Sequence, residues 1–106
     1  MSRVVVVATF KAKEGKEAEL LEGLRDLAEN SHAEAGCLTY ALHEETLDPG
    51  RYVLVENWTS QVALDAHFVQ PYIQEAANRG GELLAEPPVV RFCTPLEAGD
   101  PVKGAL

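Results

Sequence analysis

The sequence is poor in cysteine and has no long apolar run. Its two cysteines, Cys37 and Cys93, lie far apart in the chain and lack the close spacing of metal ligands. In a reducing compartment such thiols usually serve as small buried hydrophobic side chains. The apolar stretch after Arg3 ends at Lys11, too soon to span a membrane, and no signal-type cleavage region follows it. We therefore expect a cytoplasmic protein without a metal site.

Positive charge is also scarce. The chain has nine Lys and Arg residues against 17 Asp and Glu residues, which gives a net charge of −8. Because proteins that bind nucleic acid or an anionic membrane rely on clustered Lys and Arg side chains, we expect neither partner. A length of 106 residues favours one folded domain, which we place at residues 1–95. Residues 96–106 have no periodicity and are expected to form an extended C-terminal arm.

Runs of aromatic and β-branched residues predict four β-strands. Residues 3–11 and 52–58 are apolar on both faces, which is typical of central strands. Residues 37–45 alternate between the two faces, and residues 88–94 form a shorter run. Turn residues at 47–50 connect the second and third strands as a hairpin.

Helical periodicity predicts two helical regions. The first helix begins at Lys16, and Gly36 marks the position where we expect it to stop. Ser60 is the expected N-cap of a second, short helix. Pro71 opens a further helical segment, which we expect to break at the Gly80-Gly81 pair.

The resulting order β-α-β-β-α-β indicates an α+β, ferredoxin-like fold with an antiparallel four-stranded sheet. The right-handed crossover rule places the strands in the order fourth, first, third and second, so that Cys37 and Cys93 lie on opposite edges, too far apart for a disulfide. The helices of one chain cover one face of this sheet, whereas the central strands are apolar on both faces. We therefore expect a homodimer in which a second copy covers the other face.

The third strand carries the strongest candidate site residues. Its alternation places Glu56 and Trp58 on one face and Asn57 on the other. A buried carboxylate needs a partner, and we expect His67, on the following helix, to supply it. The Glu56–His67 pair also fits a purely structural ion pair, and a Trp at a strand end also fits the core.

Three motifs together resemble a known family. They are Gly36-Cys37-Leu38-x-Tyr40, the strand ending Glu56-x-Trp58, and His67 eleven residues after that Glu. Over residues 3–95 the chain is similar to the antibiotic biosynthesis monooxygenase domain family, and most closely resembles its quinol monooxygenase type. The resemblance implies a dimeric α+β barrel. Its members include cofactor-independent quinol and anthrone oxygenases, haem-degrading enzymes and small isomerase-like proteins.

The chain departs from the family pattern at two places. The usual histidine after the proline is replaced here by Tyr72, which follows Pro71. The haem-degrading branch has an Asn on the first strand where this chain has Ala8 and Thr9, which argues against haem.

The oxygenases that the chain resembles need no cofactor, because a deprotonated quinol can itself give an electron to O₂. By this resemblance the partners are a small aromatic molecule and O₂. His67 is the candidate base, Glu56 orients it or raises its pKa, and Trp58 stacks on the substrate ring. The further substrate-binding candidates are Tyr72, Asn57 and His43 as donors to the oxyanion, and Tyr40 and Phe68 as walls of the pocket.

Two other functions stay open at this point. A non-oxidative isomerase would use the same base without O₂, and a dimeric barrel could bind a small aromatic ligand or haem without turnover. For the other histidines a structural reading is favoured. His43 fits an inert position on an edge strand, and His32 fits an interaction with the C-terminus of its own helix.

Overall fold

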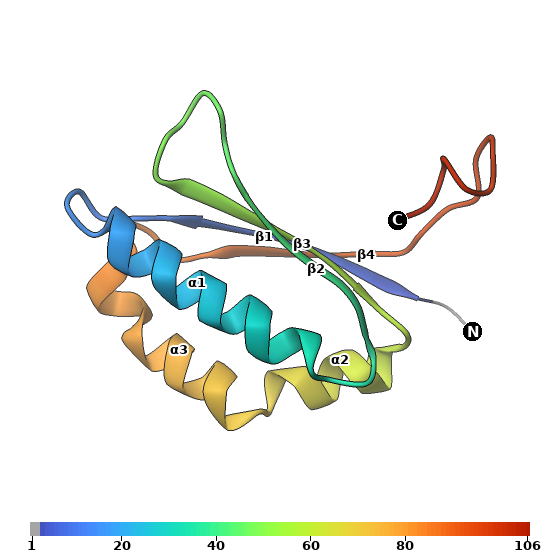
Figure 1. The fold of residues 1–106 in the computed structure, drawn as a ribbon, viewed down its shortest axis with the longest axis horizontal. Coiled ribbons are helices and arrows are strands. Elements are labelled where there is room, and N and C mark those ends of the chain that lie inside the picture. Colours follow the sequence, from blue (N-terminus) through green and yellow to red (C-terminus); the bar gives the residue numbers. More distant parts are fainter. Residues whose placement is uncertain (1–2) are drawn as a thin grey trace.

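The computed structural model describes residues 3–106, and across them three helices pack on one face of a four-stranded antiparallel sheet (Figure 1). The strands are β1 (Val4–Lys11), β2 (Cys37–Glu44), β3 (Arg51–Trp58) and β4 (Val89–Cys93). The helices are α1 (Glu17–His32), α2 (Gln61–Phe68) and α3 (Pro71–Leu83). Each predicted strand boundary agrees with the structure to within one residue.

The sheet has the order β2-β3-β1-β4, and every neighbouring pair is antiparallel. The predicted α+β, ferredoxin-like fold and its strand order are therefore confirmed. The two most apolar strands, β1 and β3, lie at the centre, as their composition predicts. Cys37 and Cys93 are on the outer strands and both are free thiols.

Side chains alternate across the sheet as the pleat requires. Val6, Ala8 and Leu54 face the helices and are almost fully buried. On the opposite face Val5 and Val55 are half-buried, and no helix of residues 3–106 covers that face (Figure 1). The core therefore lies in one layer, between the sheet and the helices.

Helix α1 ends earlier than expected. It stops at His32, and Gly36 lies in the loop that follows. The glycine is needed there because a Cβ at Gly36 would overlap the Cβ of Ala63 on α2. We expected His32 to interact with the C-terminus of its own helix, but the structure shows another partner. Its Nε2 lies 2.8 Å from the carbonyl oxygen of Tyr40 on β2.

Helix α2 begins as predicted, with the Ser60 side chain accepting a 3.1 Å hydrogen bond from the N–H of Ala63. Helix α3 begins at Pro71, but the predicted break at Gly80-Gly81 is wrong because the helix continues to Leu83. Two hydrogen bonds of 2.8 Å hold this last turn. At the end of the helix Leu84 N–H donates to the Gly80 carbonyl, and from the loop before α1 Lys13 N–H donates to the Leu83 carbonyl.

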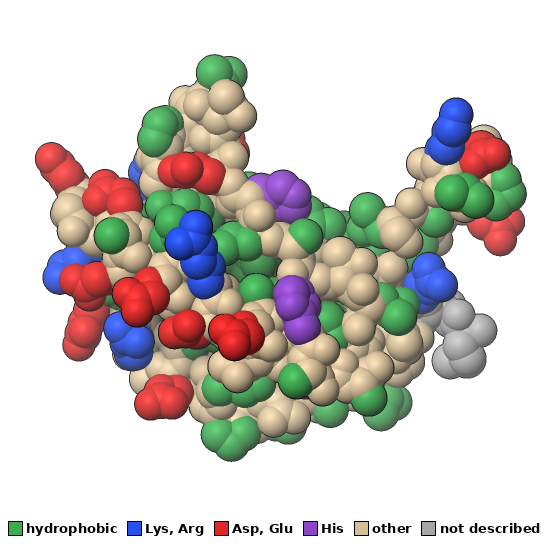
Figure 2. All heavy atoms as spheres, viewed as in Figure 1, with side chains coloured by type: hydrophobic (Ala, Val, Ile, Leu, Met, Phe, Trp, Pro, Cys, Tyr) green, Lys and Arg blue, Asp and Glu red, His purple; other side chains and the backbone are tan. Residues whose placement is uncertain are grey.

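Helix α3 lies against α1 and contributes only Leu83 to the buried core of residues 3–106. Charged side chains gather around the end of the molecule where α1 begins, whereas the end near α2 carries few of them (Figure 2). The C-terminal residues 95–106 are exposed and run away from the sheet (Figure 1). Among residues 3–106, no helix has the length and apolar character needed to cross a bilayer.

Candidate active site

A cavity of about 890 Å³ lies between the sheet and helices α1 and α3. Its polar wall is made by Tyr40, Glu56, His67 and Tyr72, which come from β2, β3, α2 and α3. The fold therefore brings together residues that are far apart in the chain. Most of the remaining wall is aliphatic or aromatic, which is typical of small-molecule sites.

His67 lies in the last turn of α2 and is 2% exposed. Its Nδ1 is 2.7 Å from Oε2 of Glu34. Because a carboxylate only accepts hydrogen bonds, this contact places the proton of a neutral imidazole on Nδ1 and leaves the lone pair on Nε2. Nε2 forms no hydrogen bond within residues 3–106, and the ring lines the cavity.

The partner of His67 is not the one expected from the sequence. We expected Glu56, which is wrong: the bonded carboxylate belongs to Glu34, in the loop between α1 and β2. Glu34 also accepts a short hydrogen bond from the Tyr72 hydroxyl, which in turn lies 3.1 Å from the Ser31 hydroxyl. This loop has no periodic pattern, so its sequence gives no signal for Glu34 beyond a carboxylate close to the Gly36-Cys37 motif.

Glu56 lies beside this group and is held by the third strand. It is 4% exposed, and its Oε1 accepts a 3.0 Å hydrogen bond from Nε1 of Trp58. Burial raises the pKa of Glu56 to about 7; the Trp58 hydrogen bond lowers it, and the nearby Glu34 carboxyl adds to the rise. Glu56 is thus a carboxyl group that exchanges its proton near neutral pH, at the wall of the cavity.

Trp58 does not reach the cavity. It is 0% exposed, and its ring centroid lies 4.5 Å from that of His67 at a tilt of 43°. Tyr40 lies edge-on to the same indole, with the centroids 6.4 Å apart. In this structure the indole therefore packs behind the imidazole and orients Glu56, and it offers no free face on which a substrate ring could stack.

Tyr40, Phe68 and Tyr72 line the cavity. Tyr40 and Phe68 were expected in its wall, whereas Tyr72 was expected as a donor to the oxyanion. Burial raises the pKa of both tyrosine hydroxyls above the ordinary value of 10, helped by Glu56 at Tyr40 and by the bond to Glu34 at Tyr72. Both phenols therefore stay protonated and act as neutral donors. Phe68 stands between His67 and Phe92 on β4, at centroid distances of 5.5 and 6.0 Å.

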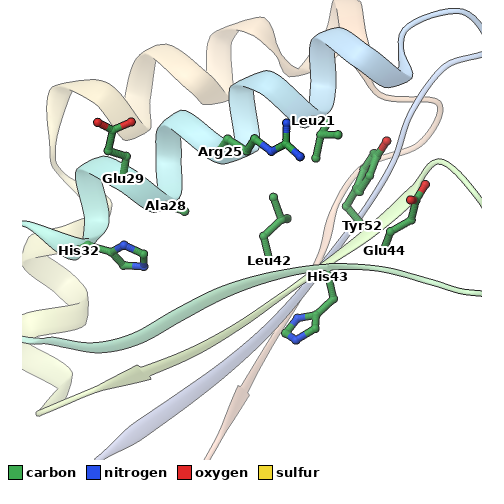
Figure 3. Close-up of a pocket in the computed structure, with 9 residues that line it drawn as sticks. All are labelled: Leu21, Arg25, Ala28, Glu29, His32, Leu42, His43, Glu44 and Tyr52. Atoms are coloured by element: carbon green, nitrogen blue, oxygen red, sulfur yellow. The ribbon is translucent and has the colours of Figure 1, made fainter.

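The structure does not bring Asn57 and His43 to the cavity. Asn57 points to the other face of the sheet, where it is 2% exposed and its Oδ1 is the one buried side-chain N or O atom of residues 3–106 without a hydrogen-bond partner. His43 is exposed on β2 and borders a separate hollow of about 510 Å³, where it lies on the side of the strand away from α1 (Figure 3). Within residues 3–106, no three His, Cys, Asp or Glu side chains come close enough together to hold a metal ion.

Comparison with known proteins agrees with the fold and the motifs. Residues 3–79 match the family model described as antibiotic biosynthesis monooxygenase. The "Putative monooxygenase Rv0793" of Mycobacterium tuberculosis is 34% identical over 96 residues, which are 91% of this chain and 94% of that protein. Its solved structure has a TM-score of 0.86 and 33% identity, and the match covers 93% of this chain and all of that one.

Two further matches point the same way. A protein from Caulobacter crescentus, solved as a "putative antibiotic biosynthesis monooxygenase", has a TM-score of 0.84 and 32% identity over 91% of this chain and 92% of that one. The uncharacterized protein sll1783 of Synechocystis sp. is 31% identical over 89 residues, which are 84% of this chain. The matched region makes up only 60% of that longer protein. Both the matched family model and the identity to Rv0793 extend over most of the chain, which therefore belongs to the antibiotic biosynthesis monooxygenase family.

Proposed function

We propose that the protein is a cofactor-independent monooxygenase that oxidises a small phenolic or quinol substrate with O₂. The observation that carries this proposal is the 2.7 Å contact between His67 Nδ1 and Glu34, which leaves Nε2 as a free base at the cavity wall. Family membership supports the reaction class. The substrate class and the use of O₂ are our inference from the base and its surroundings.

In this mechanism His67 Nε2 takes the proton of a substrate hydroxyl, and Glu34 stabilises the imidazolium that forms. The resulting phenolate is electron-rich and transfers an electron to O₂; recombination then gives a peroxide on a ring carbon. Cleavage of the O–O bond leaves one oxygen on the substrate and releases the other as water. The substrate supplies all four electrons that reduce O₂, and the two hydrogens that it loses end in the water, so that a dihydroxyarene and O₂ give a hydroxyquinone and water.

The surrounding groups have defined tasks in this scheme. Glu56, with a pKa of about 7, holds a proton near neutral pH and donates it to the departing oxygen. Trp58 positions Glu56 through its N–H. Tyr72 was expected to face the oxyanion, but its hydroxyl donates to Glu34, so we assign it to holding the Glu34–His67 pair. Tyr40 is the phenol best placed to donate to the substrate oxygen.

We also propose that the protein functions as a homodimer. Val5 and Val55 lie on the sheet face that the helices leave open, and β4 exposes Val89 on that side. A second copy packed sheet against sheet would bury these valines.

The experiment that tests the function is O₂ uptake with 1,4-dihydroxynaphthalene. Wild-type protein should consume one O₂ per quinol, and His67→Ala should lower the rate by about 100-fold or more, the range of general-base catalysis. The control is Glu29→Ala, which removes an exposed side chain of α1 outside this cavity and should leave the rate unchanged. Equal rates for the two variants, or no uptake across a panel of quinols, would contradict the proposal.

Glu56 and His67 also support a second candidate function. Both exchange or accept protons at one cavity wall, which is what an isomerase acting on a small oxo compound needs. Such an enzyme would turn over its substrate without O₂. Product formation at full rate under nitrogen would favour the isomerase, whereas a strict need for O₂ favours the monooxygenase.

A further inference from the structure

We propose that the substrate of this site carries a flexible apolar tail of about 10 Å on its hydroxylated ring, with the ring at His67 and the tail between α1 and α3. This inference rests on the proposed function for the position of the ring. It defines a substrate class, a hydroxylated ring with an apolar tail, to which a compact quinol does not belong. It follows from the length, the lining and the empty space of the cavity.

The length of the cavity is set by two anchors between antiparallel helices. At one end the hydroxyls of Ser31 on α1 and Tyr72 on α3 are 3.1 Å apart. At the other end Lys13, just before α1, bonds to the carbonyl of Leu83. Eleven residues of α3 separate Tyr72 from Leu83, which corresponds to about 16 Å at the rise of an α-helix.

The sheet gives an independent measure of the same length. Glu56 lies opposite Val6, and Tyr52 lies opposite Phe10. Both Glu56 and Phe10 line the cavity, and four residues of strand separate their levels, or about 13 Å. One six-membered ring does not fill a space of this length.

The chemical character of the wall changes along that length. The buried polar side chains of the wall, Tyr40, Glu56 and His67, are all at the first end. Beyond them the inner wall is apolar; it consists of Phe10, Leu20, Leu24, Leu27, Leu83 and Leu84. The charged lining residues Asp26, Glu75, Arg79 and Glu86 are exposed and form the rim. The inner distal part therefore favours methylene groups over hydroxyls or charges.

Two glycines keep this distal part open. Gly23 in α1 and Gly81 in α3 both line the cavity, and a Cβ at either one would meet nothing within 4 Å. Neither has a positive φ, so no turn requires a glycine. A glycine inside a helix costs about 1 kcal/mol relative to alanine. Space for a ligand is a functional reason to keep glycine at both positions despite this loss of helix stability.

The test is a binding series of 4-n-alkylphenols with chains from ethyl to decyl. These compounds are not dihydroxyarenes, and their binding can be measured under nitrogen by calorimetry and by the fluorescence of Trp58, the only tryptophan of the chain. We expect affinity to rise about fourfold for each added methylene, the gain for burying one CH₂, and then to level off once the distal part is filled.

Two matched variants separate this cavity from nonspecific apolar binding. Gly23→Leu fills the distal part, and Glu22→Leu adds the same side chain to the exposed outer side of α1. For Gly23→Leu we expect octylphenol to bind about 16-fold more weakly or worse, since at least two methylenes are excluded from the cavity, and ethylphenol to bind as in wild type. Glu22→Leu should keep the wild-type series. If Gly23→Leu does not fold, Gly81→Leu fills the same space from α3.

Each outcome decides the proposal. An affinity that does not depend on chain length, or the same series in Gly23→Leu and Glu22→Leu, would overturn it. The failure of the proposed function would look different, because quinols would give no O₂ uptake while the chain-length series persisted. Uptake of O₂ without any chain-length dependence would refute the tail alone.

Discussion

Glu34 holds Nδ1 of His67 at 2.7 Å although the two residues are 33 positions apart in the chain. The carboxylate is shielded as well, since the Glu34 side chain is 15% exposed and that of His67 is 2% exposed. A buried contact of this kind fixes both the tautomer and the ring orientation of a histidine. Glu34 is therefore the positioning residue of the candidate site, and it gives the first prediction.

Replacing Glu34 by Gln should lower kcat/KM for quinol oxidation by about tenfold to 100-fold. The amide keeps the shape but no longer stabilises the imidazolium that forms when His67 takes the substrate proton, so kcat should fall while KM stays as in wild type. O₂ uptake measured across quinol concentrations gives both parameters. Glu29→Gln, an exposed change on α1, is the control and should alter neither parameter. An unchanged kcat in Glu34→Gln would contradict the positioning role.

Replacing Glu56 by Gln should change how stability depends on pH. The ordinary pKa of this carboxyl is 4.5, and burial raises it to about 7 in the folded protein. Because the folded state binds the proton more strongly, Glu56 contributes stability that is present below about pH 4.5 and is lost as pH rises through 7. The shift corresponds to about 3 kcal/mol.

The measurement is urea unfolding of wild type and Glu56→Gln at about pH 5 and about pH 8. The variant cannot ionise at this position, so its free energy of unfolding relative to wild type should rise by up to about 3 kcal/mol between the two values. A constant difference across that range would mean that the Glu56 carboxyl does not change its protonation there.

Replacing Gly36 by Ala should destabilise the fold by about 1–3 kcal/mol, because the new methyl group would overlap Ala63 on α2 and crowd the Thr59 hydroxyl at 3.1 Å. Ala63→Gly removes the main obstacle. The double variant should therefore be more stable than the sum of the two single changes predicts. Thermal unfolding of all four proteins gives this coupling, and strict additivity would argue against the close contact.

Replacing Val55 by Glu should disrupt the proposed dimer. Val55 lies between Val7 and Ala41 on the open face of the sheet, so the change places a carboxylate at the centre of that face. Sedimentation at micromolar concentration should show a dimer for wild type and a monomer for the variant. Ala66→Glu, on the exposed side of α2, should remain dimeric. A monomeric wild type would refute the dimer itself.

The fold was predictable because its elements depend on local patterns. Strand and helix periodicities gave the order of elements, and the two most apolar strands could be placed at the centre of the sheet. The break expected at Gly80-Gly81 was wrong because a local rule was overridden by a tertiary bond, from Lys13 to the Leu83 carbonyl. Nothing in the sequence near the two glycines indicates that bond.

The site was predictable only in part, because local patterns do not show tertiary contacts. Alternation along β3 correctly places Glu56 and Trp58 together on the helix-covered face, and helical spacing brings His67 to that side. Which carboxylate binds the imidazole depends on the path of the loop after α1, and that path is set by contacts with α2 and α3. A strand pattern also does not show depth, so it could not reveal that Trp58 is packed behind His67 and away from the cavity.

Helix α3 gives only Leu83 to the core, while the rest of its inner side borders the cavity. Substitutions along this helix therefore carry a small folding cost, because they alter the space offered to a guest molecule and leave the sheet and α1 intact. Apart from Tyr72, which holds Glu34, and the buried Leu83, positions along this one helix can therefore change the guest molecule while the acid–base group and the sheet stay in place.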